Sequence, residues 1–543
     1  MKSFYVVTCS VILCCIITLQ SGYAQDSTSS LIELTEDYLA NDHIQKADSL
    51  VNSKLEHFKS SNQIDSLYQF PELIGKVVYY KGNASGAAEM AEAFVNQLKQ
   101  KTSNPRTLSK AYLSLDTLYL FLGDDTNCVR VSKKALEYAK MLDDVTYDEL
   151  GDINYIIGGN YYALYELDNA VDYFKASAKA YEKSDTVEKH ILADSYNGVA
   201  VSMWTLNKLD SAQVYFDKAI ASTQQSNLAS YDRTYYIYAF KFNQALVIDA
   251  QGRISEAIEM KKEIIQKLQE IIDGSEDEAL VKKSRRLQAS SISNLAAFYN
   301  DTGYLTRAYE MLKYSYQKKR DVYEPDSPRL ATTLMQIATC EFELQEFDKS
   351  IATTNTALKN LRASKNTYLS VEGEILYTQA NTYLAKGEID KASQLFEESE
   401  ALFNRAYPEE YSREYLILLR DYAVFLAENG NTDKAIEIAE KTYNYILKNG
   451  GDNNLPLLKE IINLSEVHFI CGNYEKSNQW AKQGIAFMKE RLQDAESEMN
   501  SAQIEFYKPK LLLLDCKSKY KSEASKNADF LRSILTELDE ATA

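Results

Sequence analysis

Cysteine, histidine and proline are all scarce in this sequence of 543 residues, which has seven cysteines, four histidines and seven prolines. No two cysteines have the CxxC spacing, and the histidines are scattered along the chain. A structural zinc site needs ligands at short, paired spacings. We therefore predict that the protein holds no metal and no cofactor.

Sequence motifs of catalysis are also missing. The chain has no GxSxG elbow, no GxxxxGK phosphate loop, no HExxH pair and no calcium-binding loop. His468 and Cys471 are close in sequence, but a nucleophile also needs an oriented base and an oxyanion site. We interpret this pair as packing residues and expect that the protein is not an enzyme.

Positive charge is deficient, since the formal net charge is −18. Binding to nucleic acid requires a clustered cationic face, so nucleic acid is not an expected partner. The acidity is compatible with a basic partner or cationic ligand, but plain solubility of a long exposed surface is the preferred interpretation.

Long apolar runs are confined to the N-terminus. Residues 4–19 are apolar after a charged start, and small residues follow at Gly22 and Ala24. This pattern is typical of a signal peptide cleaved after Ala24. A lipid anchor or an uncleaved membrane anchor is the alternative, although Leu13 is not the small residue expected before a lipidated Cys14. Nothing later approaches the roughly 20 apolar residues of a membrane helix. We expect export to the periplasm or exterior of a Gram-negative-type bacterium, with no transmembrane segment in the mature chain.

One motif recurs along the rest of the chain. It is clearest in residues 157–170 and 295–308, where an apolar residue precedes a small one, an aromatic follows three later, and a second small residue follows after twelve. The motif resembles the tetratricopeptide repeat, a pair of antiparallel helices that cross at the two small positions. Two helices approach closely only where both crossing points lack bulk.

Ten repeats can be aligned on this motif. The second small positions are Ala87, Cys128, Ala170, Ala212, Ala257, Ala308, Ser350, Ala392, Ala435 and Ser477. The first small positions are Gly75, Asp116, Gly158, Ala200, Ala245, Ala296, Ala338, Ala380, Ala423 and Ser465, where only Asp116 is not small. Glycine recurs five residues before the second small position, where we expect a left-handed turn, at Gly82, Gly123, Gly252, Gly303, Gly387, Gly430 and Gly472.

The repeat length is about 42 residues, longer than the usual 34. It resembles the kinesin-light-chain style of repeat, in which both helices are extended. One step of 51 residues contains the acidic stretch 273–280, which we interpret as a surface loop, either a partner contact or a tolerated insertion. The expected joints between repeats contain Pro105, Pro325, Pro328, Pro408 and Pro456.

The resemblance implies an all-α fold, a right-handed α-solenoid of ten to eleven helix-turn-helix units with a C-terminal cap. The predicted organisation is a signal peptide at 1–24, a cap or degenerate first repeat at 25–66, the repeat array at 67–492, and capping helices at 493–543. The degenerate repeat is suggested by Tyr38, Ile44 and Ala47. A terminal repeat has one face without a neighbour and therefore needs a cap.

The resemblance also implies a concave face lined by the first helix of each repeat. In the family, the residue two before the first small position is often an asparagine that faces this groove. Six successive repeats carry a polar residue there, namely Asn243, Asn294, Gln336, Thr378, Asp421 and Asn463, whereas the first four carry Leu73, Ser114, Ile156 and Gly198. Side-chain amides can both donate to and accept from an extended peptide. The alternative is that helix caps or surface polar residues fall at these positions.

Further inward positions add aromatic and charged candidates: Tyr155, Asn197, Trp204, Tyr377, Asn381 and Arg420. We expect a scaffold or adaptor that binds protein or peptide partners in this groove. One alternative is a glycan-binding protein of the outer membrane, which would call for a lipidated cysteine and exposed tryptophans. Another is the sensor arm of a signalling complex, which would call for a transmembrane helix and an effector domain.

Overall fold

The computed structural model describes residues 29–206, 208–364, 367–407, 411–449, 455–493, 501–523 and 526–542. The expected signal peptide and Pro408 lie outside the described residues. The chain divides at residue 248 into two compact parts, and helix α12 (Ser230–Ala250) spans the division. We call them the N-terminal part and the C-terminal part and describe each by itself.

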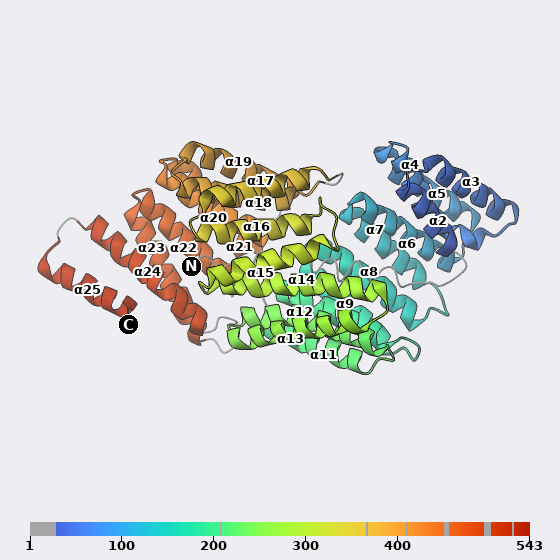
Figure 1. Cartoon of the computed structure of the whole chain (residues 1–543), viewed down its shortest axis with the longest axis horizontal. Helices are drawn as coiled ribbons and strands as arrows, with labels where there is room; N and C mark the ends of the chain where they lie inside the picture. The colour runs from blue at the N-terminus through green and yellow to red at the C-terminus, as the bar shows by residue number, and fades with distance from the viewer. Residues whose placement is uncertain are drawn as a thin grey trace. The chain divides into compact units, whose positions relative to one another are not determined.

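The N-terminal part consists of helical hairpins (Figure 1). Even-numbered helices are the first helices of the hairpins, and odd-numbered helices are the second. They are α2 (Ser29–Ala40), α3 (Ile44–Ser60), α4 (Phe70–Tyr80), α5 (Ala84–Lys101), α6 (Pro105–Leu122), α7 (Asp125–Ala139), α8 (Tyr147–Ala163), α9 (Leu167–Tyr181), α10 (Lys189–Thr205) and α11 (Leu209–Gln224), with a short 3₁₀ helix, η2 (Ile64–Gln69), before α4.

The C-terminal part continues the same pattern. Its helices are α13 (Ile254–Gly274), α14 (Glu278–Asp301), α15 (Leu305–Arg320), α16 (Pro328–Glu343), α17 (Phe347–Arg362), α18 (Leu369–Ala385), α19 (Ile389–Ala406), α20 (Arg413–Glu428), α21 (Thr432–Asn449), α22 (Leu455–Ile470), α23 (Tyr474–Gln493), α24 (Ser501–Ser522) and α25 (Ala528–Thr542). Every regular element of the described residues is helical, so the predicted all-α solenoid of helical hairpins is confirmed. No described helix is both long and apolar enough to cross a membrane.

The turn inside each hairpin depends on one left-handed residue. All seven glycines predicted to occupy this position have a positive φ, between 73° and 87°. Three hairpins without a glycine there place Asp42, Tyr165 and Gln345 in the same conformation, with φ 59°, 61° and 61°. The left-handed turn is therefore a property of the repeat's register, and glycine is the residue that adopts it at least cost.

The small residues at the helix crossings are needed for close packing. A Cβ atom on Gly158 of α8 would lie 2.8 Å from the Phe174 ring of α9. In the α22–α23 hairpin the hydroxyls of Ser465 and Ser477 each donate to the other's carbonyl, at 2.9 and 2.8 Å. Asp116, the one exception, is 2% exposed and accepts a hydrogen bond of 2.7 Å from Asn160 Nδ2.

The acidic loop expected at 273–280 in the 51-residue step is shorter than expected. Helices α13 and α14 have 21 and 24 residues, and only residues 275–277 connect them. Asp277 caps α14 by accepting hydrogen bonds from the backbone amides of Ala279 and Leu280. The loop lies where it was expected, and the other extra residues of this step lengthen the two helices.

Both ends of the array are hairpins of reduced regularity. In α2 and α3 the crossing positions are Thr35 and Ala47, both fully buried, which supplies the eleventh repeat. At the other end, Leu511 and Leu514 of α24 pack on the core residues of α22 and α23, and Ser518 Oγ lies 2.8 Å from Ser477 Oγ. The predicted repeat number and C-terminal cap are thus confirmed, whereas the domain boundaries at residues 66 and 492 stay predictions.

Candidate protein interaction surface

The first helices of neighbouring hairpins lie side by side, as α4 with α6, α16 with α18, and α20 with α22. Their side chains form hydrogen bonds from one repeat to the next. Most of the residues predicted as groove contacts lie on this layer, and the structure brings several of them together.

The hydroxyl of Tyr377 on α18 donates a hydrogen bond of 2.5 Å to Asp421 Oδ2 on α20. Burial and the negative charge of Asp421 raise the pKa of Tyr377 well above its ordinary value, so the phenol keeps its proton. Asn381 Nδ2 donates to the Tyr377 carbonyl at 3.2 Å, and the Thr378 hydroxyl donates to the Glu374 carbonyl at 3.0 Å. Tyr377, Thr378, Asn381 and Asp421 all remain half-buried, which leaves part of each side chain accessible.

Arg420 connects the same surface to α22. Its Nη1 lies 2.5 Å from Oε1 of Glu460, which is fully buried, while the Arg420 side chain is 19% exposed. Asn463 Nδ2 donates to the Arg420 carbonyl at 3.2 Å. Charge-assisted bonds of this kind hold a guanidinium in a fixed orientation. We call Tyr377, Thr378, Asn381, Arg420 and Asp421 the α18–α20 patch.

The amide members of the predicted ladder lie deeper than expected. Asn243, Asn294, Gln336 and Asn463 are between 3% and 7% exposed. Asn243 Nδ2 donates to Asn197 Oδ1 at 3.3 Å, between α12 and α10. The side-chain oxygens of Asn243, Gln336 and Asn463 are buried without a hydrogen-bond partner among the described residues. These amides are neither caps nor surface residues, and the accessible members of the ladder are Thr378 and Asp421. Whether any of them contacts a partner stays a prediction.

The predicted residues of the N-terminal part do not form one cluster of this kind. Asn197 is 2% exposed, and the Tyr155 ring packs on Phe174 with 5.4 Å between ring centroids. Trp204 is half-buried near the C-terminal end of α10. Tyr155 and Trp204 are therefore the two of these three that a partner could reach.

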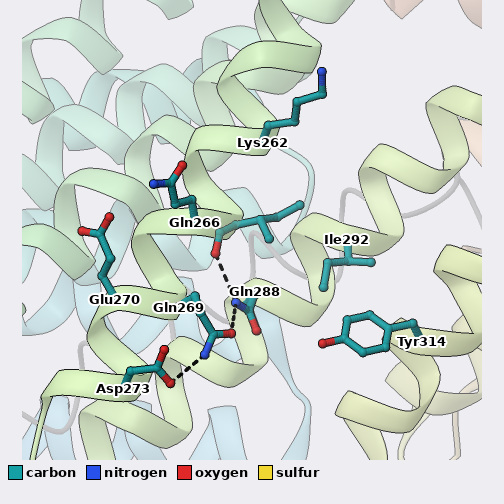
Figure 2. Close-up of a pocket in the computed structure, with 9 residues that line it drawn as sticks. Lys262, Gln266, Gln269, Glu270, Asp273, Gln288, Ile292 and Tyr314 are labelled. Atoms are coloured by element: carbon teal, nitrogen blue, oxygen red, sulfur yellow. Dashed lines mark hydrogen bonds between the residues drawn. The ribbon is translucent and has the colours of Figure 1, made fainter.

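A hollow of about 380 Å³ opens in the C-terminal part between α13, α14 and α15 (Figure 2). Gln288 is 4% exposed and donates to the Ile265 carbonyl at 3.1 Å and to Gln269 Oε1 at 3.0 Å. Gln269 in turn donates to Asp273 Oδ1 at 2.8 Å. Figure 2 shows Tyr314 on the opposite side, beside Ile292. The side-chain amides of Gln269 and Gln288 are thus engaged in hydrogen bonds along the wall of the hollow.

A metal site and a reactive pair of His468 and Cys471 each have their own structural requirements. Among the described residues, no group of three or more His, Cys, Asp and Glu side chains could hold a metal ion. His468 is 1% exposed, and its pKa is lowered by burial and by the positive charge of Lys476.

Sequence reasoning missed two acidic residues of the first-helix layer, Glu374 on α18 and Glu460 on α22. Glu460 stands 40 residues after Arg420, close to one repeat length, and this spacing was a usable signal for their contact. Glu374 on α18 has a pKa raised well above its ordinary value by burial and by the nearby charge of Glu414 on α20. Glu374 has the same signal, because Glu414 stands 40 residues after it, but the burial that raises its pKa depends on how α18 and α20 pack.

Structures of tetratricopeptide-type proteins are similar to this chain. The apo form of NprR, a quorum sensor of B. thuringiensis, is 13% identical, with 79% of this chain and 99% of that chain covered and a TM-score of 0.43. A kinesin-light-chain protein of Podosopora anserina with nearly identical TPR-like repeats is 16% identical, with 39% and 98% covered and a TM-score of 0.33. A tetratricopeptide repeat protein of Parabacteroides merdae is 12% identical, with 57% and 95% covered and a TM-score of 0.35.

These similarities concern the repeat fold and carry no argument about partners. No family model and no curated protein matches the sequence. The hairpins, crossing residues and left-handed turns of the chain itself confirm the predicted resemblance to tetratricopeptide repeats.

Proposed function

We propose that this chain is an exported, non-enzymatic scaffold that binds a polypeptide partner on the first-helix layer, at the α18–α20 patch. The observation that carries the proposal is the bond between Tyr377 and Asp421, which fixes two half-buried polar side chains from neighbouring repeats. Groups that are held in place before binding lose little conformational entropy when a partner arrives.

The chemistry of the patch suits a polypeptide. Asn381 can donate through its second amide N–H and accept through its side-chain oxygen, and the Thr378 hydroxyl, which already donates to Glu374, can accept. Asp421 accepts, and Arg420 has further N–H donors beside the one bound to Glu460. An extended main chain offers both N–H and C=O groups at a regular spacing. A surface with both kinds of partner group therefore matches a main chain better than it matches a ligand of one charge.

The test adds a large side chain to the patch and keeps the ion pair between Arg420 and Glu460. Asn381→Arg should lower the amount of co-purifying partner protein at least about tenfold, a loss of roughly 1.4 kcal/mol. Asn404→Arg places the same side chain on an exposed position of α19 and should leave capture unchanged. Thermal unfolding by circular dichroism checks that both variants are folded. Capture by Asn381→Arg at the wild-type level would contradict the proposal.

Export has a separate test. The apolar segment 4–19 followed by Gly22 and Ala24 supports cleavage by signal peptidase. Cell fractionation and N-terminal sequencing should find a mature chain that begins at Gln25 outside the cytoplasm. A chain that retains Met1 in the cytoplasmic fraction would exclude export while leaving the scaffold proposal intact.

A further inference from the structure

Three aromatic rings are exposed together in the N-terminal part. Tyr79 and Tyr80 of α4 are 39% and 38% exposed, and Phe121 of α6 is 38% exposed. The ring centroids of Tyr79 and Phe121 are 4.9 Å apart, those of Tyr79 and Tyr80 are 5.6 Å apart, and those of Tyr80 and Phe121 are 6.1 Å apart. We call these three residues the aromatic cluster.

The register of the repeat explains why the rings meet. Tyr80 and Phe121 each stand five residues after the first crossing position of their repeat, Gly75 and Asp116. The equivalent residues of α18 and α20 are Ala385 and Glu428, so the repeat fold does not require aromatic residues there. Large aromatic side chains exposed side by side mark contact surfaces, because water solvates their faces poorly.

The geometry of the rings is suited to a ridged, rigid ligand. Tyr80 and Phe121 are close to parallel, with 30° between their planes, and Tyr79 stands nearly perpendicular to both, at 78° and 81°. A proline-rich segment forms a polyproline II helix, which presents ridges of apolar rings and carbonyl groups without internal hydrogen bonds. Aromatic faces receive the proline rings, and tyrosine hydroxyls can donate to the carbonyls.

A negative charge lies next to the cluster. Lys76 Nζ is 5.6 Å from the Phe121 ring centroid and 2.6 Å from both Glu72 Oε1 and Glu36 Oε1. Two carboxylates share one ammonium, which leaves one negative charge in excess. The Glu36 side chain on α2 is 49% exposed, whereas those of Lys76 and Glu72 are 11% and 9% exposed. A cationic group of a partner would therefore meet Glu36.

We propose that the aromatic cluster and Glu36 bind a proline-rich segment of a partner protein that carries a lysine or arginine beside its prolines. The aromatic rings supply the apolar contact, and the Glu36 carboxylate selects the basic residue by a charge-assisted hydrogen bond. This surface shares no residue with the α18–α20 patch, so the two proposals can fail independently.

The experiment uses the full chain and a labelled synthetic peptide of about ten residues, proline throughout with one arginine at its end. Fluorescence anisotropy should show saturable binding to the wild type. Tyr80→Ser and Phe121→Ser should each weaken binding at least about tenfold, the effect of losing a central aromatic contact. Tyr304→Ser, which removes a tyrosine 64% exposed in the C-terminal part, should leave binding unchanged. Thermal unfolding identifies any variant that fails to fold. If Phe121→Ser unfolds, the Tyr80→Ser variant still tests the proposal.

Two control peptides distinguish the contribution of the prolines from that of the arginine. A glycine-serine peptide with the same arginine should not bind, and an arginine-free proline peptide should bind more weakly to the wild type. Glu36→Gln should abolish the difference between the two proline peptides. Equal binding of the glycine-serine peptide, or no saturable binding by the wild type, would overturn the proposal. So would light scattering that finds a wild-type dimer and a Phe121→Ser monomer, because the cluster would then join two copies of this chain.

Discussion

Tyr377 and Asp421 join two neighbouring repeats through one hydrogen bond of 2.5 Å between a phenol and a carboxylate. Tyr377→Phe removes the hydroxyl that donates to Asp421, so the half-buried Asp421 carboxylate loses this hydrogen bond. We expect the free energy of unfolding of the C-terminal part to fall by about 1–2 kcal/mol. Urea denaturation followed by far-ultraviolet circular dichroism measures this change. Tyr304→Phe, at an exposed tyrosine, is the matched control, and an equal loss in both variants would show that the Asp421 bond contributes nothing.

Asp116 places a carboxyl at a crossing where nine other repeats have a small residue. Burial raises the pKa of Asp116 from 3.8 to about 7, although the hydrogen bond from Asn160 opposes this effect. The folded protein therefore holds this proton more tightly than the unfolded chain, and stability is lost as the pH rises from about 4 to about 7.

Asp116→Ala should therefore stabilise the protein at pH 8, with a gain that shrinks toward pH 4. At about 1.4 kcal/mol per pH unit between the two pKa values, the gain is on the order of 4 kcal/mol at most. Thermal unfolding as a function of pH measures it. Asp168→Ala, at a side chain 83% exposed, should show no such pH dependence. A gain that is constant from pH 4 to pH 8 would mean that relief of crowding, not of buried charge, explains the effect.

Lys319 on α15 is the opposite case. It is 4% exposed, and its ammonium contacts the hydroxyls of Ser293 and Thr333 at 3.1 and 2.7 Å. Burial and the positive charge of Arg329 lower its pKa from 10.5 to about 7. The unfolded chain binds this proton more tightly, so wild-type stability rises between about pH 7 and pH 10.5.

Lys319→Met should raise the free energy of unfolding by a few kcal/mol at pH 7 and below, and the gain should fade toward pH 10. Denaturation by urea at pH 6.5 and pH 9.5 measures both values. Lys313→Met, at an exposed lysine of the same helix, serves as the control. A destabilised Lys319→Met at pH 6.5 would show that the two hydroxyl contacts outweigh the cost of burying the charge.

Gln345 has a left-handed backbone at a position where seven hairpins have glycine. A non-glycine residue in this conformation destabilises the folded state by about 1–2 kcal/mol. Substitution by glycine removes this strain, but the greater freedom of glycine in the unfolded chain offsets part of the gain in stability. Gln345→Gly should stabilise the protein by about 0.5–1 kcal/mol, measured by thermal unfolding. Gln345→Ala separates the causes, since it removes the same side chain without relieving the backbone and should give no gain.

The features of this fold that could be predicted from the sequence are those that recur in every repeat. The crossing residues and left-handed glycines could be located from spacing alone, because each hairpin must solve the same two packing problems. The same register also marks Tyr165 and Gln345 as left-handed, although their residue types gave no such signal. The loop expected at 273–280 was predicted longer than it is, because polar, charged residues suit exposed helix ends as well as loops.

The candidate surface was harder to predict than the fold. Register places Asn294 and Gln336 on the first-helix layer, but their depth depends on how closely successive first helices approach, and both are buried. Thr378 and Asp421 occupy the same register and stay half-exposed. The aromatic cluster went unnoticed because sequence alone does not distinguish the exposed Tyr80 from a buried tyrosine such as Tyr161.

The central claim is that a polypeptide partner contacts the first-helix layer at the α18–α20 patch. Site-specific photocrosslinking tests it most directly, with p-benzoylphenylalanine placed either at Thr378 on α18 or at Glu397, an exposed residue of α19. We predict a covalent adduct with a partner protein from position 378 and none from position 397. Adducts from position 397 alone, or equal adducts from both positions, would contradict this account.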